Sequence, residues 1–486
     1  MKNHIFKLLA GPIVFVVLSL VPMGGMERPG QLVLAVFLWE VVWWVTQPVP
    51  WAITALLPLI LLPSFEVMNV TDTASLYGQT VFFWIMGLAL FGFAMEKHGL
   101  AKRFAIRLLT LSFVGNSTHR LLFFYMLAST LLSMFVTDAG VVAMMLPIGL
   151  SLISYIRSVG GQGKVPVGRS NLGNFIAIGT LYSSIAGGMA TIMGSPPNIV
   201  AASVHERIAG EPIGFFQWMW IGVPVSLTML VIFYFILRVF FPPEFKEIPG
   251  GQEFLQQEAR KLGKLNQGEK NVLITFAVMV ILFVAPSIAP FVLEPDDPIN
   301  LWFRRGLSIW AVPPIVMFFL FAMPSDVKKP TWTLTWKDAV EQTPWNATML
   351  CTGAVAMTQA LGQFGFVDFM KNALTGFGLT ATTLPFVTSF STVIMTEIAS
   401  GVAVAALLGN IFIPAAAEIG FNSVSLTILL AQVAIGKMFP WSGAPAAMTF
   451  ASGETEIKNM FKVALVADFF LAVTVVLIHL LFAPFF

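Results

Sequence analysis

The hydrophobic positions of this chain fall into long apolar runs that are separated by short polar segments. A helix needs about 20 apolar residues to cross the hydrocarbon core of a bilayer. Eleven runs are close to that length and are predicted to span a membrane: 1–23, 31–47, 49–64, 78–95, 172–204, 216–240, 272–293, 306–323, 346–367, 424–452 and 460–483. The pattern therefore predicts an all-α polytopic membrane protein.

Two further apolar stretches, 121–156 and 385–420, are each interrupted in the middle by polar or small residues. The halves on either side of the interruption are marginal in length for a full crossing. Non-helical backbone at membrane depth is tolerated where it is buried in protein or lines a cavity. We therefore predict two re-entrant helical hairpins in addition to the eleven spans.

Lysine and arginine orient the predicted spans, because they are enriched in cytoplasmic loops. With the N-terminus in the cytoplasm, the first hairpin opens inward, the second opens outward, and the C-terminus is extracellular. The polar stretch 242–271 becomes a cytoplasmic linker between two halves. The basic residues that support this orientation are Lys97, Lys102, Arg103, Arg107, Arg120, Lys328, Lys329 and Lys337.

Composition excludes several classes of protein. Hydrophobic residues make up 57% of the chain and charged residues only 11%, far from the soluble norm of about a quarter charged. The one cysteine, Cys351, provides neither a disulfide nor a cysteine metal site. A net charge of +2 gives no indication of a nucleic-acid partner. No catalytic constellation and no cofactor motif is apparent, so the sequence predicts a protein that is not an enzyme.

An internal repeat relates the two halves. "GLALFGFAMEKHGL" at 87–100 aligns with "GAVAMTQALGQFGF" at 353–366, and "SMFVTDAGVVA" at 133–143 aligns with "TEIASGVAVAA" at 396–406. "GSPPNIVAAS" from Gly194 and "SGAPAAMTFAS" from Ser442 follow in the same order. Since the halves have opposite predicted orientations, this is an inverted-topology repeat, in which discontinuous helices commonly meet at a midplane site.

Three motifs carry a resemblance to a known family. These are "SSIAGGMATIMGSPPNIV" at 183–200, "EKHGLAKRFAIRLL" at 96–109 and "LGKLNQGEKNVLI" at 262–274. The chain resembles the divalent anion:sodium symporter family of dicarboxylate, citrate and sulfate carriers over essentially its whole length. The resemblance implies a homodimer in which a scaffold holds a transport domain that moves as an elevator. It places the scaffold at 1–111 and 272–375, and the transport domain at 112–241 and 376–486.

The same resemblance implies where substrate would bind. Sodium-coupled members carry Ser-Asn-Thr at each hairpin tip, where oxygens touch substrate carboxylate and help complete two sodium sites. This chain has Thr137-Asp138-Ala139 and Ser400-Gly401-Val402 at the tips, Ser195-Pro196-Pro197-Asn198 in the first broken helix, and Gly443-Ala444-Pro445 in the second. The second half has lost side-chain oxygens at Val402, Gly443 and Ala446. A hard cation needs about six oxygen ligands, so we expect the second sodium site to be absent.

Three charged residues have open roles. Lys437 is expected deep in an apolar helix, where a charge is usually paired or functional. It either supplies fixed positive charge in place of sodium or is structural, for example paired with Glu397. Asp138 retains a cation at a residual first site with Asn198, accepts a proton, or hydrogen-bonds the hairpin backbone. For Glu397 a hairpin-stabilising role is favoured.

These features favour secondary transport of C4 and C5 dicarboxylates such as succinate, malate or 2-oxoglutarate, with obligate exchange as the leading mode. The alternative is sodium- or proton-coupled symport of dicarboxylate, citrate or sulfate. A membrane-embedded enzyme or an anion channel is a more remote alternative. The expected partners are the substrate, membrane lipid and a second copy of the chain.

Overall fold

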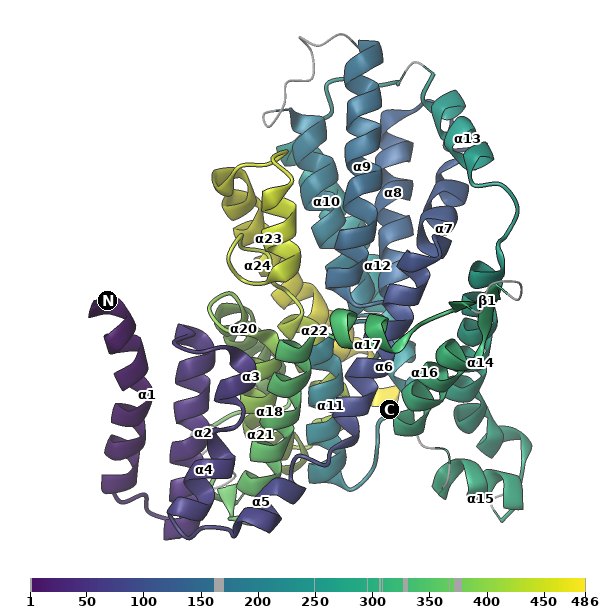
Figure 1. Cartoon of the computed structure of the whole chain (residues 1–486). Helices are drawn as coiled ribbons and strands as arrows, with labels where there is room; N and C mark the ends of the chain where they lie inside the picture. Colours follow the sequence, from purple (N-terminus) through teal and green to yellow (C-terminus); the bar gives the residue numbers. More distant parts are fainter. Residues whose placement is uncertain are drawn as a thin grey trace.

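The computed structural model describes residues 2–485 except 161–169, 249, 295, 306, 308, 327–330, 367 and 371–377. In this part of the chain the structure is almost entirely helical (Figure 1). Seven of the described helices are long and apolar enough to cross a membrane, and several apolar helices are shorter. The predicted all-α polytopic membrane fold is therefore confirmed.

The helices follow the predicted runs closely. The first half contains α1 (Lys2–Leu20), α2 (Arg28–Thr46), α3 (Trp51–Thr54), α4 (Leu57–Ser64), α5 (Val70–Ser75), α6 (Thr80–Lys97), α7 (Leu100–Leu109), α8 (Thr118–Ser133), α9 (Asp138–Gly160), α10 (Asn171–Gly188), α11 (Pro196–Ala209) and α12 (Phe215–Phe240). The run at 49–64 is split between α3 and α4, and the first hairpin is α8 with α9.

The second half begins with α13 (Gly251–Lys261), a helix within the polar stretch that the sequence predicts as a linker. It continues with α14 (Gln267–Val292), α15 (Pro298–Arg305), η1 (Ile309–Ala311), α16 (Val312–Ala322), α17 (Trp336–Gln342), α18 (Trp345–Gln363), α20 (Thr383–Thr396), α21 (Gly401–Glu418), α22 (Ser423–Ala434), α23 (Ala444–Ala451), α24 (Ile457–Phe482) and η2 (Ala483–Phe485). The second hairpin is α20 with α21. The short strands β1 (Pro324–Asp326) and β2 (Thr331–Trp332) pair antiparallel.

Both discontinuous helices break where the local sequence requires it. The first is interrupted between Gly188 and Pro196, and the second between Ala434 and Ala444. Proline stands at the first or second position of the helix that follows each break. Proline has no N–H to donate but fits the first turn, so it starts a new helix and cannot continue the old one.

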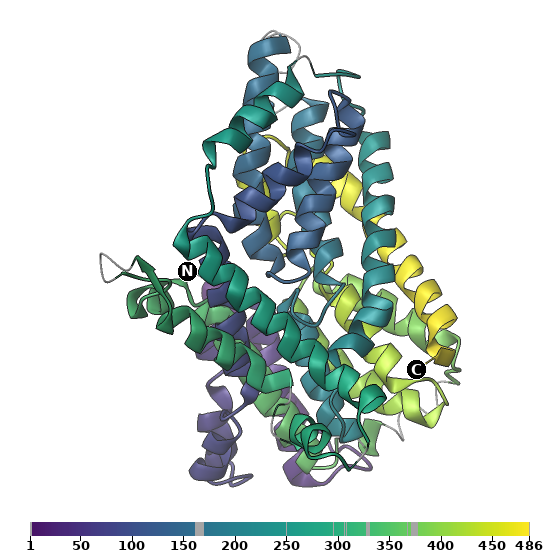
Figure 2. The ribbon, with the colours of Figure 1, turned by 90° about the vertical axis from the view of Figure 1, so that its right-hand side faces the viewer.

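Packing relates the two halves as the repeat predicts. The arms of the first hairpin, α8 and α9, both pack on α10, and those of the second, α20 and α21, both pack on α22. The partners are exchanged for the second part of each broken helix: α11 packs on α21, and α23 packs on α9. The helices that follow, α12 and α24, lie side by side (Figure 2). Each hairpin therefore encloses one broken helix and contacts the end of the other.

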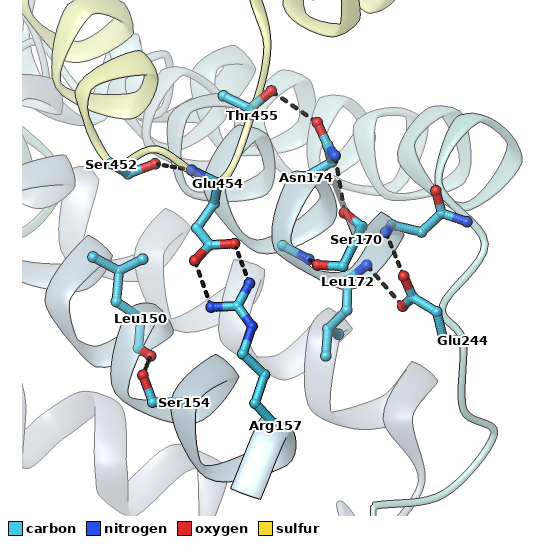
Figure 3. Close-up of polar contacts among 12 residues, drawn as sticks. Leu150, Ser154, Arg157, Ser170, Leu172, Asn174, Glu244, Ser452, Glu454 and Thr455 are labelled. Carbon is cyan, nitrogen blue, oxygen red and sulfur yellow. Dashed lines mark hydrogen bonds and ion pairs between the residues drawn. The ribbon is translucent and has the colours of Figure 1, made fainter. Parts of the chain in front are cut away.

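At one end of the bundle, polar contacts join α9, α10 and the segment after α23 (Figure 3). Arg157 of α9 makes two hydrogen bonds to the Glu454 carboxylate, at 2.7 and 2.6 Å. Thr455 donates to the Asn174 side chain of α10 at 2.9 Å. Glu244 accepts hydrogen bonds from the backbone N–H groups of Asn171 and Leu172 at the start of α10. The segment after α23 is thereby held against the first hairpin and its broken helix.

Candidate functional site

The predicted site residues lie at the beginnings of four helices. Thr137 directly precedes α9, while Ser195, Ser400 and Gly443 are the N-caps of α11, α21 and α23. The other predicted positions, Asp138, Ala139, Pro196, Pro197, Asn198, Gly401, Val402, Ala444 and Pro445, lie in the first turns. A helix N-terminus presents unpaired N–H groups and about half a positive charge. The starts of α21 and α23 are therefore suited to binding carboxylate oxygens, whereas α11 begins with Pro196 and Pro197, which have no N–H to offer.

The hydroxyl groups at these starts are available. Neither Ser195 nor Ser400 uses its side chain to cap its own helix. No hydrogen bond of the Thr137 hydroxyl is found among the described residues either, although its carbonyl oxygen accepts from the Val141 amide. Serine and threonine side chains normally cap the first N–H groups of a helix. Because none of these hydroxyls does so here, all three remain free for a ligand.

Backbone contacts hold the first hairpin tip against the first broken helix. The Asp138 amide donates to the Gly194 carbonyl oxygen at 3.3 Å, and the Thr191 hydroxyl donates to the Met134 carbonyl oxygen. The Asn198 amide group donates to the carbonyl oxygens of Gly188 and Thr191, at 2.8 and 2.9 Å. Asn198 therefore fixes the break in this helix, and since both of its side-chain N–H groups are used, the predicted contact with a substrate carboxylate has no donor left.

Glu397 has the equivalent function in the second half. Its carboxylate oxygens accept hydrogen bonds from the backbone amides of Met438 at 2.7 Å and Phe439 at 3.0 Å. The carboxylate thus joins the second hairpin tip to the segment 435–443 that interrupts the second broken helix. These are the hairpin-stabilising contacts that the sequence favours for Glu397.

Lys437 is placed differently from the sequence prediction. It does not lie in a helix, because α22 ends at Ala434 and the residues from 436 to 438 are irregular. Its stem runs past two glycines: a β-carbon built on Gly443 would lie 2.9 Å from Lys437 Cδ, and one built on Gly401 would lie 3.1 Å from Cε. The prediction of a helical lysine is wrong because the helix has already ended at Ala434, and Lys437 belongs to the break.

The Lys437 ammonium has no carboxylate within 4.0 Å in the part of the chain that the structure describes. The pairing with Glu397 that the sequence left open is not formed there, because both Glu397 oxygens are engaged by backbone amides. The ammonium does attract Asp138 and Glu397 at longer range. Lys437 therefore adds positive charge between the second tip and the second break, in electrostatic range of the first tip.

The side-chain oxygens that could bind a cation differ between the two halves. Asp138 is 5% exposed and accepts a hydrogen bond from the Ala139 amide at 3.0 Å. The Asn198 Oδ1 and Ser195 Oγ atoms are buried and have no hydrogen-bond partner among the described residues. Hard cations such as sodium take oxygen ligands of this kind. The buried oxygens of the first half are therefore suited to bind a cation. In the second half, Val402, Gly443 and Ala446 provide no side-chain oxygen.

A buried polar chain that the sequence does not predict connects the first break to α22 and α24. The Gln432 side chain of α22 donates to the Met189 carbonyl oxygen at 3.1 Å. Its Oε1 atom lies 2.9 Å from His479 Nε2, and His479 Nδ1 lies 2.9 Å from the Ser425 hydroxyl. Asp468 on α24 is also buried, and its Oδ1 atom has no partner among the described residues. Their polar side chains inside apolar spans could have indicated this chain, because burying an unpaired polar group in a membrane costs free energy.

The fold and this arrangement of broken helices define a multi-pass membrane transporter. The family model described as the sodium:sulfate symporter transmembrane region matches residues 2–486. The chain therefore belongs to this family, and the resemblance found in the sequence is confirmed.

Known proteins with sequence similarity cover nearly the whole chain. The sodium-dependent dicarboxylate transporter SdcS of Staphylococcus saprophyticus is 28% identical over 486 residues, covering 99% of this chain and 92% of its own length. The transporter of the same name from Staphylococcus aureus is 28% identical over 484 residues, covering 98% and 90%.

Solved structures support the fold. The YdaH transporter of Alcanivorax borkumensis aligns with a TM-score of 0.55 at 14% identity, covering 94% of this chain and 99% of its own. The MtrF protein of Neisseria gonorrhoeae aligns with a TM-score of 0.55 at 10% identity, covering 94% and 95%. At this level of identity the similarity concerns the fold alone.

Proposed function

We propose that this protein is a secondary transporter of C4 and C5 dicarboxylates and that uptake is coupled to a cation bound in the first half of the site. The observation that carries the proposal is the set of four helix starts with uncapped hydroxyls at Thr137, Ser195 and Ser400, two of which, those of α21 and α23, lie beside Lys437. The buried oxygens of Ser195 and Asn198 beside the first tip support a cation there. The relatives named sodium-dependent dicarboxylate transporters support both the substrate class and sodium as the cation.

In this proposal the hairpins and broken helices move together as an elevator. The transport domain comprises 112–241 and 376–486, and the scaffold comprises 1–111 and 272–375 in a homodimer. The N-terminus is cytoplasmic and the C-terminus extracellular. The packing of each hairpin on the broken helix of its own half and on the end of the other supports one moving unit.

Obligate exchange is a second candidate, and the observation that favours it is Lys437. A fixed ammonium stays with the transport domain when the substrate leaves, so an empty crossing would carry a charge that the substrate no longer balances. Moving an unbalanced charge through a membrane interior costs several kcal/mol by insertion scales. The transport domain would then cross the membrane in each direction only with a dicarboxylate bound.

Uptake of labelled succinate into proteoliposomes distinguishes these modes. We expect uptake into vesicles without internal dicarboxylate when an inward sodium gradient is imposed, and little uptake with potassium. The sodium dependence should have a Hill coefficient near one, since the second half has no side-chain oxygen at Val402, Gly443 and Ala446 to complete a second cation site. Uptake that requires internal dicarboxylate and is indifferent to sodium would establish exchange instead. Absence of transport of succinate, malate and 2-oxoglutarate in every condition would refute the substrate class.

Thr137→Ala and Ser400→Ala are each expected to weaken dicarboxylate binding. Each change removes one hydroxyl donor from a helix start. A hydrogen bond to a charged group contributes about 1.5 to 3 kcal/mol, or about tenfold to hundredfold in affinity. The measurement is the apparent affinity for succinate in proteoliposomes.

Ser154→Ala is the matched control for these variants. Ser154 lies on the exposed side of α9, and its hydroxyl donates to the Leu150 carbonyl oxygen at 2.9 Å (Figure 3). It should retain the wild-type affinity. Wild-type affinity in both Thr137→Ala and Ser400→Ala would remove these hydroxyls from the substrate site.

A further inference from the structure

Two adjoining cavities form a groove between α14 and the first hairpin. The first cavity, of about 360 Å³, is lined by apolar side chains of α6, α7, α8 and α14, among them Leu132, Phe135 and Phe276. The second, of about 320 Å³, shares Leu100, Phe104 and Leu273 with the first. The two cavities are therefore parts of one groove, which we call the α7 groove.

The chemistry changes along the α7 groove. All of the residues that line the first cavity are leucine, phenylalanine or methionine. The second cavity adds the basic residues Arg103 and Arg107. Phe104 and Leu273, at the junction, are 39% and 38% exposed. A groove that is apolar at one end and cationic at the other matches a molecule with an apolar chain and an anionic head.

The two arginines are not equivalent. Arg103 is 4% exposed and pairs with Glu269, with Nη2 3.0 Å from Oε2, so its charge is already balanced. Arg107 is exposed, and its guanidinium makes no hydrogen bond or ion pair with the described residues, although the Glu269 carboxylate attracts it at longer range. Lys270 is also exposed, one helical turn before Leu273. Of the basic residues that line the α7 groove, Arg107 is therefore the one whose charge remains for a ligand.

We propose that the α7 groove binds one phospholipid with an anionic headgroup. An acyl chain fills the cavity beside Phe276, and the phosphate lies at Arg107. Basic residues at a membrane surface attract anionic lipid, with a contribution of about fivefold in affinity for each residue. A neutral or zwitterionic lipid would gain less from the same position.

The position of the groove gives such a lipid a functional role. Phe135 at the first hairpin tip contacts Phe276 of α14 edge-on, with ring centroids 5.0 Å apart. The bound chain would touch both the hairpin and α14. If the hairpin moves relative to α14 during transport, as the proposed elevator requires, the lipid would stabilise the arrangement in which the groove exists.

The test is the lipid retained by purified protein after reconstitution into vesicles of equimolar phosphatidylcholine and phosphatidylglycerol and mild detergent extraction. Native mass spectrometry counts the retained lipids and identifies them. Wild-type protein should retain phosphatidylglycerol in preference to phosphatidylcholine. Arg107→Gln should lower that preference about fivefold, and Leu273→Trp, which fills the groove, should lower retention of both lipids. Lys458→Gln removes an exposed basic residue that lines neither cavity, so it should behave as wild type.

Equal retention of the two lipids by the wild type would overturn the proposal, since it would indicate ordinary bulk lipid. So would an unchanged preference in Arg107→Gln, or unchanged retention in Leu273→Trp. Size-exclusion profiles that match the wild type show that each variant is folded. This result is independent of the transported substrate, because the retained lipid is measured without transport.

Discussion

Lys437→Gln is expected to weaken dicarboxylate binding at least about 30-fold, whichever cation is present. Removing one partner of a buried charge pair costs about 2 to 5 kcal/mol of binding free energy. Here the group removed is the ammonium that would balance part of the charge of the dicarboxylate. The glutamine keeps the carbon stem as far as Cδ, the atom that lies beside Gly443, but is one atom shorter and removes the charge. Binding of succinate to purified protein, measured by calorimetry in sodium and in potassium buffers, gives the effect without the transport cycle.

Lys437→Arg retains the charge and changes the shape, so it should keep part of the affinity. Lys462→Gln, which removes an exposed lysine from α24, should bind as the wild type does. If Lys437→Gln binds succinate normally in both buffers, the lysine has only a structural function and another group must balance the substrate.

The same variant separates the two coupling modes. If the fixed charge of Lys437 restrains the empty transporter, Lys437→Gln should increase the ratio of net uptake to exchange at saturating substrate. A ratio equal to that of the wild type would show that the ammonium does not determine whether the empty protein can return.

Gly401→Ala is the second change for which a large effect is expected. Gly401 begins α21 at the second hairpin tip, and a methyl group there would overlap the Ala434 carbonyl oxygen at the end of α22. This neighbour is backbone and cannot rotate away, so the tip must shift. Overpacking of this kind typically costs about 1 to 3 kcal/mol. We expect at least a tenfold loss of transport and a lower unfolding temperature.

Gly24→Ala is the control, because nothing lies within 4 Å of a β-carbon at that position. Both variants can be measured by succinate uptake and by thermal unfolding in detergent. Wild-type uptake by Gly401→Ala would show that the tip does not need its close approach to α22, and would weaken the assignment of Ser400 and Gly401 to the site.

The sequence by itself determined the spans, the two hairpins and the repeat. The bilayer imposes a fixed length on apolar helices, so the run lengths are readable without a partner, as at 216–240, which became α12. The sequence also predicted the helix breaks, because Pro196 and Pro445 have no backbone N–H and each can start a helix but not continue one. The start residues of α9, α11, α21 and α23 followed from that pattern together with the family resemblance.

Only the tertiary structure decided which groups these residues contact. The sequence could not tell that Lys437 lies in the break after α22 between two glycines, or that Glu397 binds the amides of Met438 and Phe439. It also gave no indication that Gln432 and His479 join the first break to α22 and α24. These partners are far apart in sequence, and a buried polar group takes whichever donor or acceptor the packing of neighbouring helices brings within reach. Apolar length is a local property of the chain, whereas the pairing of buried polar groups depends on how the helices pack.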